Sequence, residues 1–258
     1  MKPNGLLDFL PIWAIYVLTP AFGYLAVEIG HRIATRWRRR AQGKAEAPAA
    51  PIVGATLGLF AFLLAFTFGS ASSRFEERKQ AVLAETNAIQ SAYLRAAALP
   101  EPMASDSRNT LREYVDLRLN GVTTSQVAQT MARSEEMHKR LWSNAVAAAN
   151  EKSPVATLFM TSLNDVISLH GKRVTAGLYN RIPAPIWIAL YLLLMLAMAV
   201  IGYYEWMSGT MRSLAVIGLV LAFSLVLGLI ADIDRPGEGR LQVSQQSLVD
   251  LRRSMNPP

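Results

Sequence analysis

The sequence contains no cysteine among its 258 residues, which excludes disulfide bonds, thiol nucleophiles and thiolate metal sites. Histidine is scarce as well, and its three copies, His31, His138 and His170, lie in different segments. A glycine-rich phosphate loop, an HExxH sequence and a nucleophile elbow are all missing. No catalytic constellation is visible, so we expect a protein that is not an enzyme.

Charged residues are missing from four stretches, each 19 residues or longer: 9–27, 47–73, 182–204 and 213–231. A helix needs about 20 mainly apolar residues to cross a hydrocarbon core of roughly 30 Å. The pattern predicts an integral protein of the cell (inner) membrane, with the lipid bilayer as a partner. We place the four transmembrane helices at 1–31, 52–73, 182–204 and 213–231.

The segments between these helices are polar. The largest, 74–181, carries apolar residues at helical spacing and is interrupted by Pro100-Glu101-Pro102. The second transmembrane helix continues into it without glycine or proline before Pro100, so we expect one long helix leaving the membrane. The other segments are a basic loop at 32–51, a tight connection at 205–212, and an acidic turn with a C-terminal tail at 232–258. The predicted fold class is an all-α membrane protein, with four transmembrane helices and a helical extramembrane domain inserted between helices 2 and 3.

The formal net charge is +7, and residues 31–44 contribute six basic side chains and no acid. Beside a membrane helix such a cluster is typical of contact with anionic lipid headgroups. No basic-aromatic interleaving favours nucleic acid as a partner. By the positive-inside rule, the loop 32–51 is cytoplasmic and the helical domain extracytoplasmic.

The second transmembrane helix has the most unusual composition of the four. Phe62, Phe66, Ser70, Ser73 and Glu77 recur at spacings that place them on one helical face. One interpretation is a pore helix, in which an aromatic constriction widens into hydroxyl groups and then charge. The alternative is a helix that packs against lipid and its neighbours with phenylalanine as filler, and the residues of this helix alone favour the alternative.

Three further polar residues are candidates for a polar interface. Glu28 lies near the end of the first helix, where ionisable residues are functional candidates, but it also precedes Arg32 by four residues, the favourable order for an ion pair along a helix. Asn164 and Asp165 either line a polar interface or cap and pair within a solvated bundle.

Asp232, Asp234 and Glu238 lie within seven residues, directly after the last apolar run. Clustered carboxylates are typical ligands of hard cations such as Ca²⁺, although this stretch lacks the full EF-hand spacing. Alternatively, Asp232 and Asp234 pair with Arg235 or another basic residue, and the following Pro-Gly turn ends the helix. Ca²⁺ is the one candidate cofactor, and none is certain.

Four pieces in this order resemble the bestrophin superfamily, and most of all its bacterial bestrophin-like membrane proteins. The apolar second helix passes into "SRFEERKQAVLAETNAI", similar to the region that follows the pore helix in bacterial bestrophins. "SLNDVISLHGKR" and "NRIPAPIWIALYLLLM" resemble the helix and the entry to the third span. A tight hairpin leads into the fourth span, and "LIADIDRPGEG" with "VSQQSLVDL" is placed like the bestrophin acidic segment and its following helix.

The resemblance implies an oligomeric ion channel, a homopentamer around a pore lined by the second helix. Bestrophins pass small inorganic ions, mostly anions such as chloride, and some bacterial members pass cations. By position, Asp232 and Asp234 match the acidic segment that contributes to a Ca²⁺ clasp in animal members, and Arg235 is able to take the place of the cation. In bestrophin topology the basic loop lies outside, opposite to the orientation that its charge indicates. The alternative function is a non-conducting membrane sensor or scaffold whose helical domain binds a ligand or partner protein.

Overall fold

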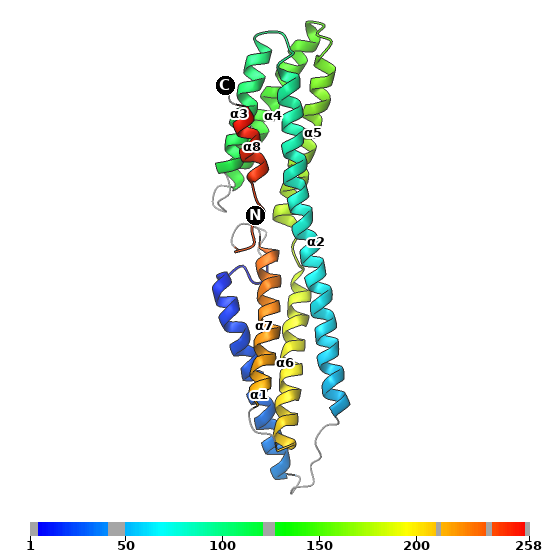
Figure 1. Ribbon diagram of the computed structural model, residues 1–258, viewed down its shortest axis with the longest axis vertical. Coiled ribbons are helices and arrows are strands. Elements are labelled where there is room, and N and C mark those ends of the chain that lie inside the picture. Colours follow the sequence, from blue (N-terminus) through cyan, green and yellow to red (C-terminus); the bar gives the residue numbers. More distant parts are fainter. Residues whose placement is uncertain (1–4, 41–49, 121–126, 210–212, 236–238, 256–258) are drawn as a thin grey trace. The chain divides into compact units, whose positions relative to one another are not determined.

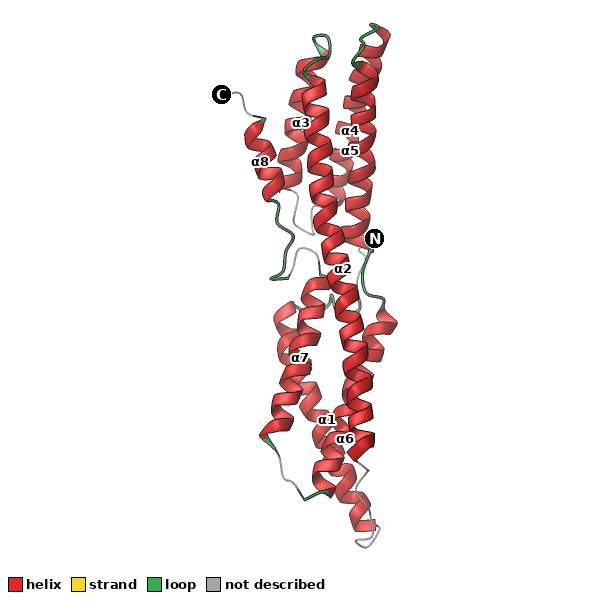
Figure 2. Ribbon diagram, turned by 45° about the vertical axis from the view of Figure 1, so that its right-hand side comes forward, coloured by secondary structure: helices red, strands yellow, loops and turns green. Residues whose placement is uncertain are grey.

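A computed structural model describes residues 5–40, 50–120, 127–209, 213–235 and 239–255, and within these ranges it is helical with no strand (Figure 2). The elements are α1 (Ile12–Arg40), α2 (Ala50–Ala96), α3 (Met103–Asn120), α4 (Val127–Asn150), α5 (Ala156–Val174), the π-helical turn η2 (Thr175–Tyr179), α6 (Ala184–Met207), α7 (Leu214–Asp234) and α8 (Gln246–Ser254) (Figure 1). The chain divides into a first unit, Met1–Ser73 with Arg181–Leu241, and a second unit, Arg74–Asn180 with Gln242–Pro258.

Four helical stretches are long and apolar enough to cross a membrane: Ile12–Arg40, Ala50–Ala96, Ala156–Met207 and Leu214–Asp234. The predicted all-helical membrane fold with four apolar spans is therefore confirmed. The first helix ends later than we expect from the sequence. α1 continues to Arg40, so residues 32–40 of the expected basic loop are helical. Three arginines occupy the last turn of α1, where positive charge is favoured by the helix dipole.

In the first unit, α1 packs against α6 and α7. At Gly30 an added Cβ atom would lie 2.0 Å from the carbonyl oxygen of Ala199, and at Gly202 it would lie 2.1 Å from that of Val27. Only a hydrogen atom fits at either position. Small residues let helix backbones approach closely in membranes, so these two glycines allow α1 and α6 to come into backbone contact.

α2 packs in the first unit through one face. Phe60 is fully buried, and its ring centroid lies 4.9 Å from that of Phe223 on α7. Leu64 and Ala71 extend this buried face at helical spacing. α7 itself begins at a cap in which the Ser213 hydroxyl oxygen accepts a hydrogen bond from the backbone N of Ala215, at 3.1 Å.

The second unit contains the remainder of α2 with α3, α4, α5 and α8. Its apolar core includes Ile89, Leu111, Tyr114, Leu141, Phe159, Leu163 and Leu248. The C-terminal helix α8 belongs to this unit: the Tyr93 hydroxyl donates to the carbonyl oxygen of Met255 at 3.0 Å, and the Arg252 guanidinium lies 2.6 Å from the Asp116 carboxylate.

Within the polar region, the prediction of one long helix continuing from the second span is confirmed. The prediction for the helical domain leaves out a segment that also belongs to it. α2 is one helix of 47 residues and ends before Pro100, as the absence of glycine and proline from residues 74–99 predicts. The compact unit, however, is not formed by residues 74–181 alone, because α8 from the expected tail contributes Leu248 and Leu251 to its core. An insertion between two spans therefore describes only part of the second unit.

The close approach of α1 and α6 gives a first prediction. We expect Gly30→Ala to force the two helices apart and to lower the free energy of unfolding by about 2 kcal/mol, the usual cost of overpacking. Denaturant unfolding of the purified protein in detergent measures this difference. Gly171→Ala on α5 is the matched control, because no atom lies within 4 Å of its added Cβ. Equal stabilities of the two variants would contradict the packing argument.

Candidate functional site

The predicted pore residues lie along one helix and are mostly accessible in the single chain. Phe62 is 70% exposed and Phe66 is 69% exposed, although both belong to an apolar helix. Ser70 is half-buried, whereas Ser73 and Glu77 are exposed, and the Glu77 carboxylate accepts a hydrogen bond from the Asn180 side chain at 3.1 Å. The opposite face carries Phe60 and the other buried residues, so packing in the first unit leaves the phenylalanine face uncovered.

The acidic stretch after α7 is buried and satisfied by protein groups. One Asp234 oxygen accepts from Nε of Arg181 at 3.1 Å, and the other accepts from the backbone N of Ile182 at 2.9 Å. Arg181 also donates to Asp8 at 2.8 Å. The Arg235 guanidinium lies 3.4 Å from Asp8 and donates to the backbone carbonyls of Leu7 and Leu10. We call Asp8, Arg181, Asp234 and Arg235 the N-terminal clasp.

The residues of this region do not fit a Ca²⁺ site. Ca²⁺ takes six to eight oxygen ligands, whereas both oxygens of Asp234 already accept hydrogen bonds and Oδ1 of Asp232 accepts from the backbone N of Arg240 at 2.8 Å. Within the described ranges no group of three or more acidic or histidine side chains is placed to hold a metal ion. Glu238, the third predicted ligand, lies outside the described residues. Carboxylate and carbonyl oxygens surround Arg235 instead.

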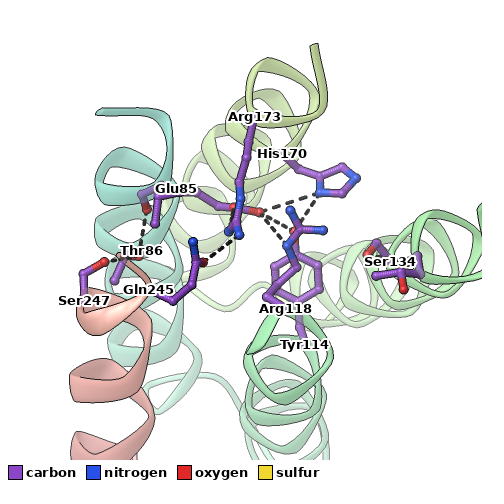
Figure 3. Close-up of polar contacts among 11 residues, drawn as sticks. Glu85, Thr86, Tyr114, Arg118, Ser134, His170, Arg173, Gln245 and Ser247 are labelled. Carbon is purple, nitrogen blue, oxygen red and sulfur yellow. Dashed lines mark hydrogen bonds and ion pairs between the residues drawn. The ribbon is translucent and has the colours of Figure 1, made fainter. Parts of the chain in front are cut away.

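A second buried cluster, centred on Glu85, was not predicted from the sequence. Figure 3 shows Glu85 of α2 facing Tyr114 and Arg118 of α3 and His170 and Arg173 of α5. The carboxylate is completely buried, and its oxygens lie 2.7 Å from the Tyr114 hydroxyl and 2.7 Å from the Arg173 guanidinium. Arg118 and His170 each lie 3.6 Å from it. These five residues form the Glu85 network.

The contacts of the Glu85 network determine which groups donate and which accept each hydrogen bond. A carboxylate held between two guanidinium groups is ionised and can only accept, so the Tyr114 hydroxyl donates a hydrogen bond to Glu85. Nδ1 of His170, 3.1 Å from the same hydroxyl oxygen, must then be the donor in that contact. Arg173 also donates to the Gln245 side chain at 2.9 Å, which connects the residue before α8 to the network.

His138 of α4 completes this region. Its ring centroid lies 5.1 Å from those of both Tyr114 and His170. Burial, and then the neighbouring His170, lower the pKa of His138 from 6.5 to about 4, so the ring is neutral at neutral pH. Burial and the adjacent Glu85 carboxylate raise the pKa of Tyr114 well above its usual value. The phenol therefore stays protonated and keeps its hydrogen bond to Glu85.

The predicted interface residues are not gathered into one site. Glu28 is paired along α1, with its carboxylate 3.5 Å from Arg32 and 3.8 Å from His31. Asn164 and Asp165 lie on the exposed side of α5 in the second unit. Their interface role stays a prediction.

Removing the charge of Glu85 should destabilise the second unit. Glu85→Gln leaves Arg118 and Arg173 buried without a counter-charge, so we expect the free energy of unfolding to fall by about 3 kcal/mol. Chemical denaturation followed by helical circular dichroism measures the loss. Glu136→Gln, which removes an exposed carboxylate from α4, should change it by less than about 0.5 kcal/mol. A loss no larger than that of the control would show that the network is energetically irrelevant.

His138 should make stability depend on acid pH. The unfolded imidazole binds a proton near pH 6.5, whereas the folded ring resists protonation until about pH 4. Stability should therefore fall as the pH is lowered through this window, by on the order of 2 kcal/mol. His138→Gln should flatten that part of the profile, while the neighbouring exposed Lys139→Gln should not. An unchanged slope in His138→Gln would assign the acid sensitivity to other groups.

The sequence matches a protein-family model, and the fold matches several solved structures. A model of the bestrophin-like domain matches residues 17–248. A variant of a bacterial bestrophin homologue from Klebsiella pneumoniae superimposes with a TM-score of 0.69 at 12% identity, covering 98% of this chain and 97% of that chain. A second variant gives a TM-score of 0.66 at 13% identity, with 95% and 97% covered.

A crystal structure described as a membrane protein has a TM-score of 0.70 at 13% identity, covering 95% of this chain and 97% of that chain. The search among curated proteins gave no match. At these identities the solved structures establish a shared fold, and the family model covers most of the sequence. The protein belongs to the bestrophin-like family.

Proposed function

We propose that this protein is the subunit of an oligomeric ion channel of the cell membrane, with the exposed face of α2 lining the pore. The observation that carries the proposal is the uncovered face of Phe62 and Phe66 on a helix whose other face is buried. The bestrophin resemblance supports five copies arranged around that face. The cargo would be small inorganic ions, chloride among them.

The order of side chains along α2 favours a pore over a surface that only faces lipid. The phenylalanine pair is followed along the helix by Ser70 and Ser73 and then by Glu77. A ring of phenylalanines from several copies would form an apolar constriction, which controls ion flow by dewetting. Hydroxyl groups and carboxylates beyond it would hold water and ions. Gly54 and Gly58, whose added Cβ atoms would meet no neighbour in the single chain, leave room for adjacent copies to approach.

Single-channel recording in planar bilayers tests the proposal. Phe62→Ala and Phe66→Ala should raise the conductance several-fold or hold the channel open, because they widen and wet the constriction. Leu221→Ala on α7 removes another exposed apolar side chain, 54% accessible, and should leave the current unchanged. Gel filtration and particle imaging of the same sample give the number of copies and the helix at the symmetry axis.

Absence of current from the wild type over a range of pH, Ca²⁺ concentration and voltage would count against the channel. A monomer or dimer with α2 facing detergent would point to the non-conducting sensor or scaffold instead. The orientation in the membrane remains a prediction, since the charge of the loop 32–51 and the bestrophin topology place it on opposite sides.

A further inference from the structure

Two arginines of the second unit converge on one phenol oxygen. Arg108 and Arg112 lie one turn apart on α3, and their Nη2 atoms lie 2.9 Å and 2.6 Å from the hydroxyl oxygen of Tyr93 on α2. Their guanidinium carbons lie 4.8 Å and 5.4 Å from the centroid of the Tyr93 ring. Because both side chains donate to the same oxygen, two positive charges are held close together.

Further contacts fix the position of this arginine pair at the end of α8. The Tyr93 hydroxyl donates a hydrogen bond to the carbonyl oxygen of Met255 at 3.0 Å. Arg112 donates to the same carbonyl oxygen through Nε at 2.9 Å, and to the Asn109 side chain through Nη1 at 2.9 Å. Met255 directly follows α8, which packs against α3. The pair therefore lies where three helices of the second unit meet.

Neither Arg108 nor Arg112 has an acidic partner among the residues that the structure describes. The acids of the same helix interact with other arginines: Asp106 pairs with Arg140, Asp116 pairs with Arg252, and Glu113 also acts on Arg140. The carbonyl oxygen of Met255 brings only the partial charge of a helix C-terminus, about half an elementary charge. More than one positive charge therefore remains without compensation at the pair.

Arg108 also has hydrogen-bond donors that the protein does not use. A guanidinium carries five N–H groups in a rigid plane, and within the described ranges that of Arg108 donates only to Tyr93. Its Nε is buried and has no hydrogen-bond partner. A buried donor without an acceptor costs free energy, and an oxyanion beside Arg108 would remove that cost. Both arginines are only half-buried, so a small solute can reach them.

We propose that Arg108 and Arg112 bind a phosphate group, carried either by inorganic phosphate or by a small phosphomonoester. A dianion matches the uncompensated charge of the pair, whereas a single carboxylate would neutralise only part of it. Guanidinium groups bind phosphate oxygens through parallel, charge-assisted hydrogen bonds, and the unused N–H groups of Arg108 are available for them. Tyr93 is a positioning residue, because its hydroxyl oxygen holds both guanidinium groups in place.

Isothermal titration calorimetry of the full chain in detergent micelles tests the site. The probe is inorganic phosphate at about pH 8, where it is mainly a dianion, with chloride keeping the ionic strength constant. Wild type should give a saturable heat. Arg108→Gln should weaken the affinity at least about tenfold, because it removes a charged donor. Arg133→Gln, which removes an exposed arginine from α4, is the matched control and should bind as wild type does.

Equal affinities of Arg108→Gln and Arg133→Gln would overturn the proposal, as would a wild type that gives no heat with phosphate up to about 10 mM. If Arg108→Gln does not fold, the unfolding temperature of the wild type provides a second test. Phosphate should raise it above the value in acetate or chloride of the same ionic strength, because a ligand of the folded state stabilises that state. The same unfolding temperature in all three salts would refute the site.

Glycerol 3-phosphate, titrated in the same way, distinguishes the two sources of the phosphate group. Binding tighter than that of inorganic phosphate would identify a phosphomonoester as the ligand, and weaker or no binding would identify the free ion. Neither the calorimetry nor the unfolding measurement requires ion conduction.

Discussion

The second unit depends on one buried carboxylate. Glu85 has no exposed surface, and its negative charge is matched by guanidinium groups from α3 and α5. Burying such ions rarely adds net stability compared with apolar residues, because desolvation offsets the attraction. The Glu85 network restricts how the helices can pack. Only one arrangement of α2, α3 and α5 pairs all of these buried charges, and any other arrangement leaves a charge buried without a partner. We infer that the network selects the packing of a core that apolar contacts alone would leave less defined.

The helical membrane fold could be predicted because its signals are local. Uncharged stretches mark the spans, and the lack of glycine and proline between Gly69 and Pro100 marks the second span and the polar helix after it as one continuous helix. The Glu85 network was missed because it depends on residues from three helices meeting in space. One signal was present: Glu85 lies three residues after Val82 and four before Ile89, both buried, so it interrupts an apolar stripe. A single acid at such a position has no partner visible in the sequence.

The acidic stretch after α7 shows why local composition is a poor guide to metal binding. Its carboxylates suggest a hard cation, yet the positive charge that they meet comes from the chain itself. Arg181 precedes α6 and Arg235 follows α7, and both reach Asp8 near the N-terminus. Three segments that are distant in the sequence meet there. The ion pairs of the N-terminal clasp therefore hold together the start of α1, the start of α6 and the end of α7. The guanidinium of Arg235 provides the positive charge that a bound cation would otherwise provide. Because it is a side chain of the protein, it cannot dissociate as an ion can.

α2 is held by different forces along its length. Its Ala50–Ser73 part is anchored by apolar contacts such as Phe60 with Phe223, which are non-directional and tolerate small rotations. Its later part is anchored by the charged and hydrogen-bonded contacts of Glu85, which depend on distance and angle. Because hydrogen bonds and ion pairs depend on direction, Glu85 restricts the rotation of this later part of α2 against α3 and α5 within the second unit.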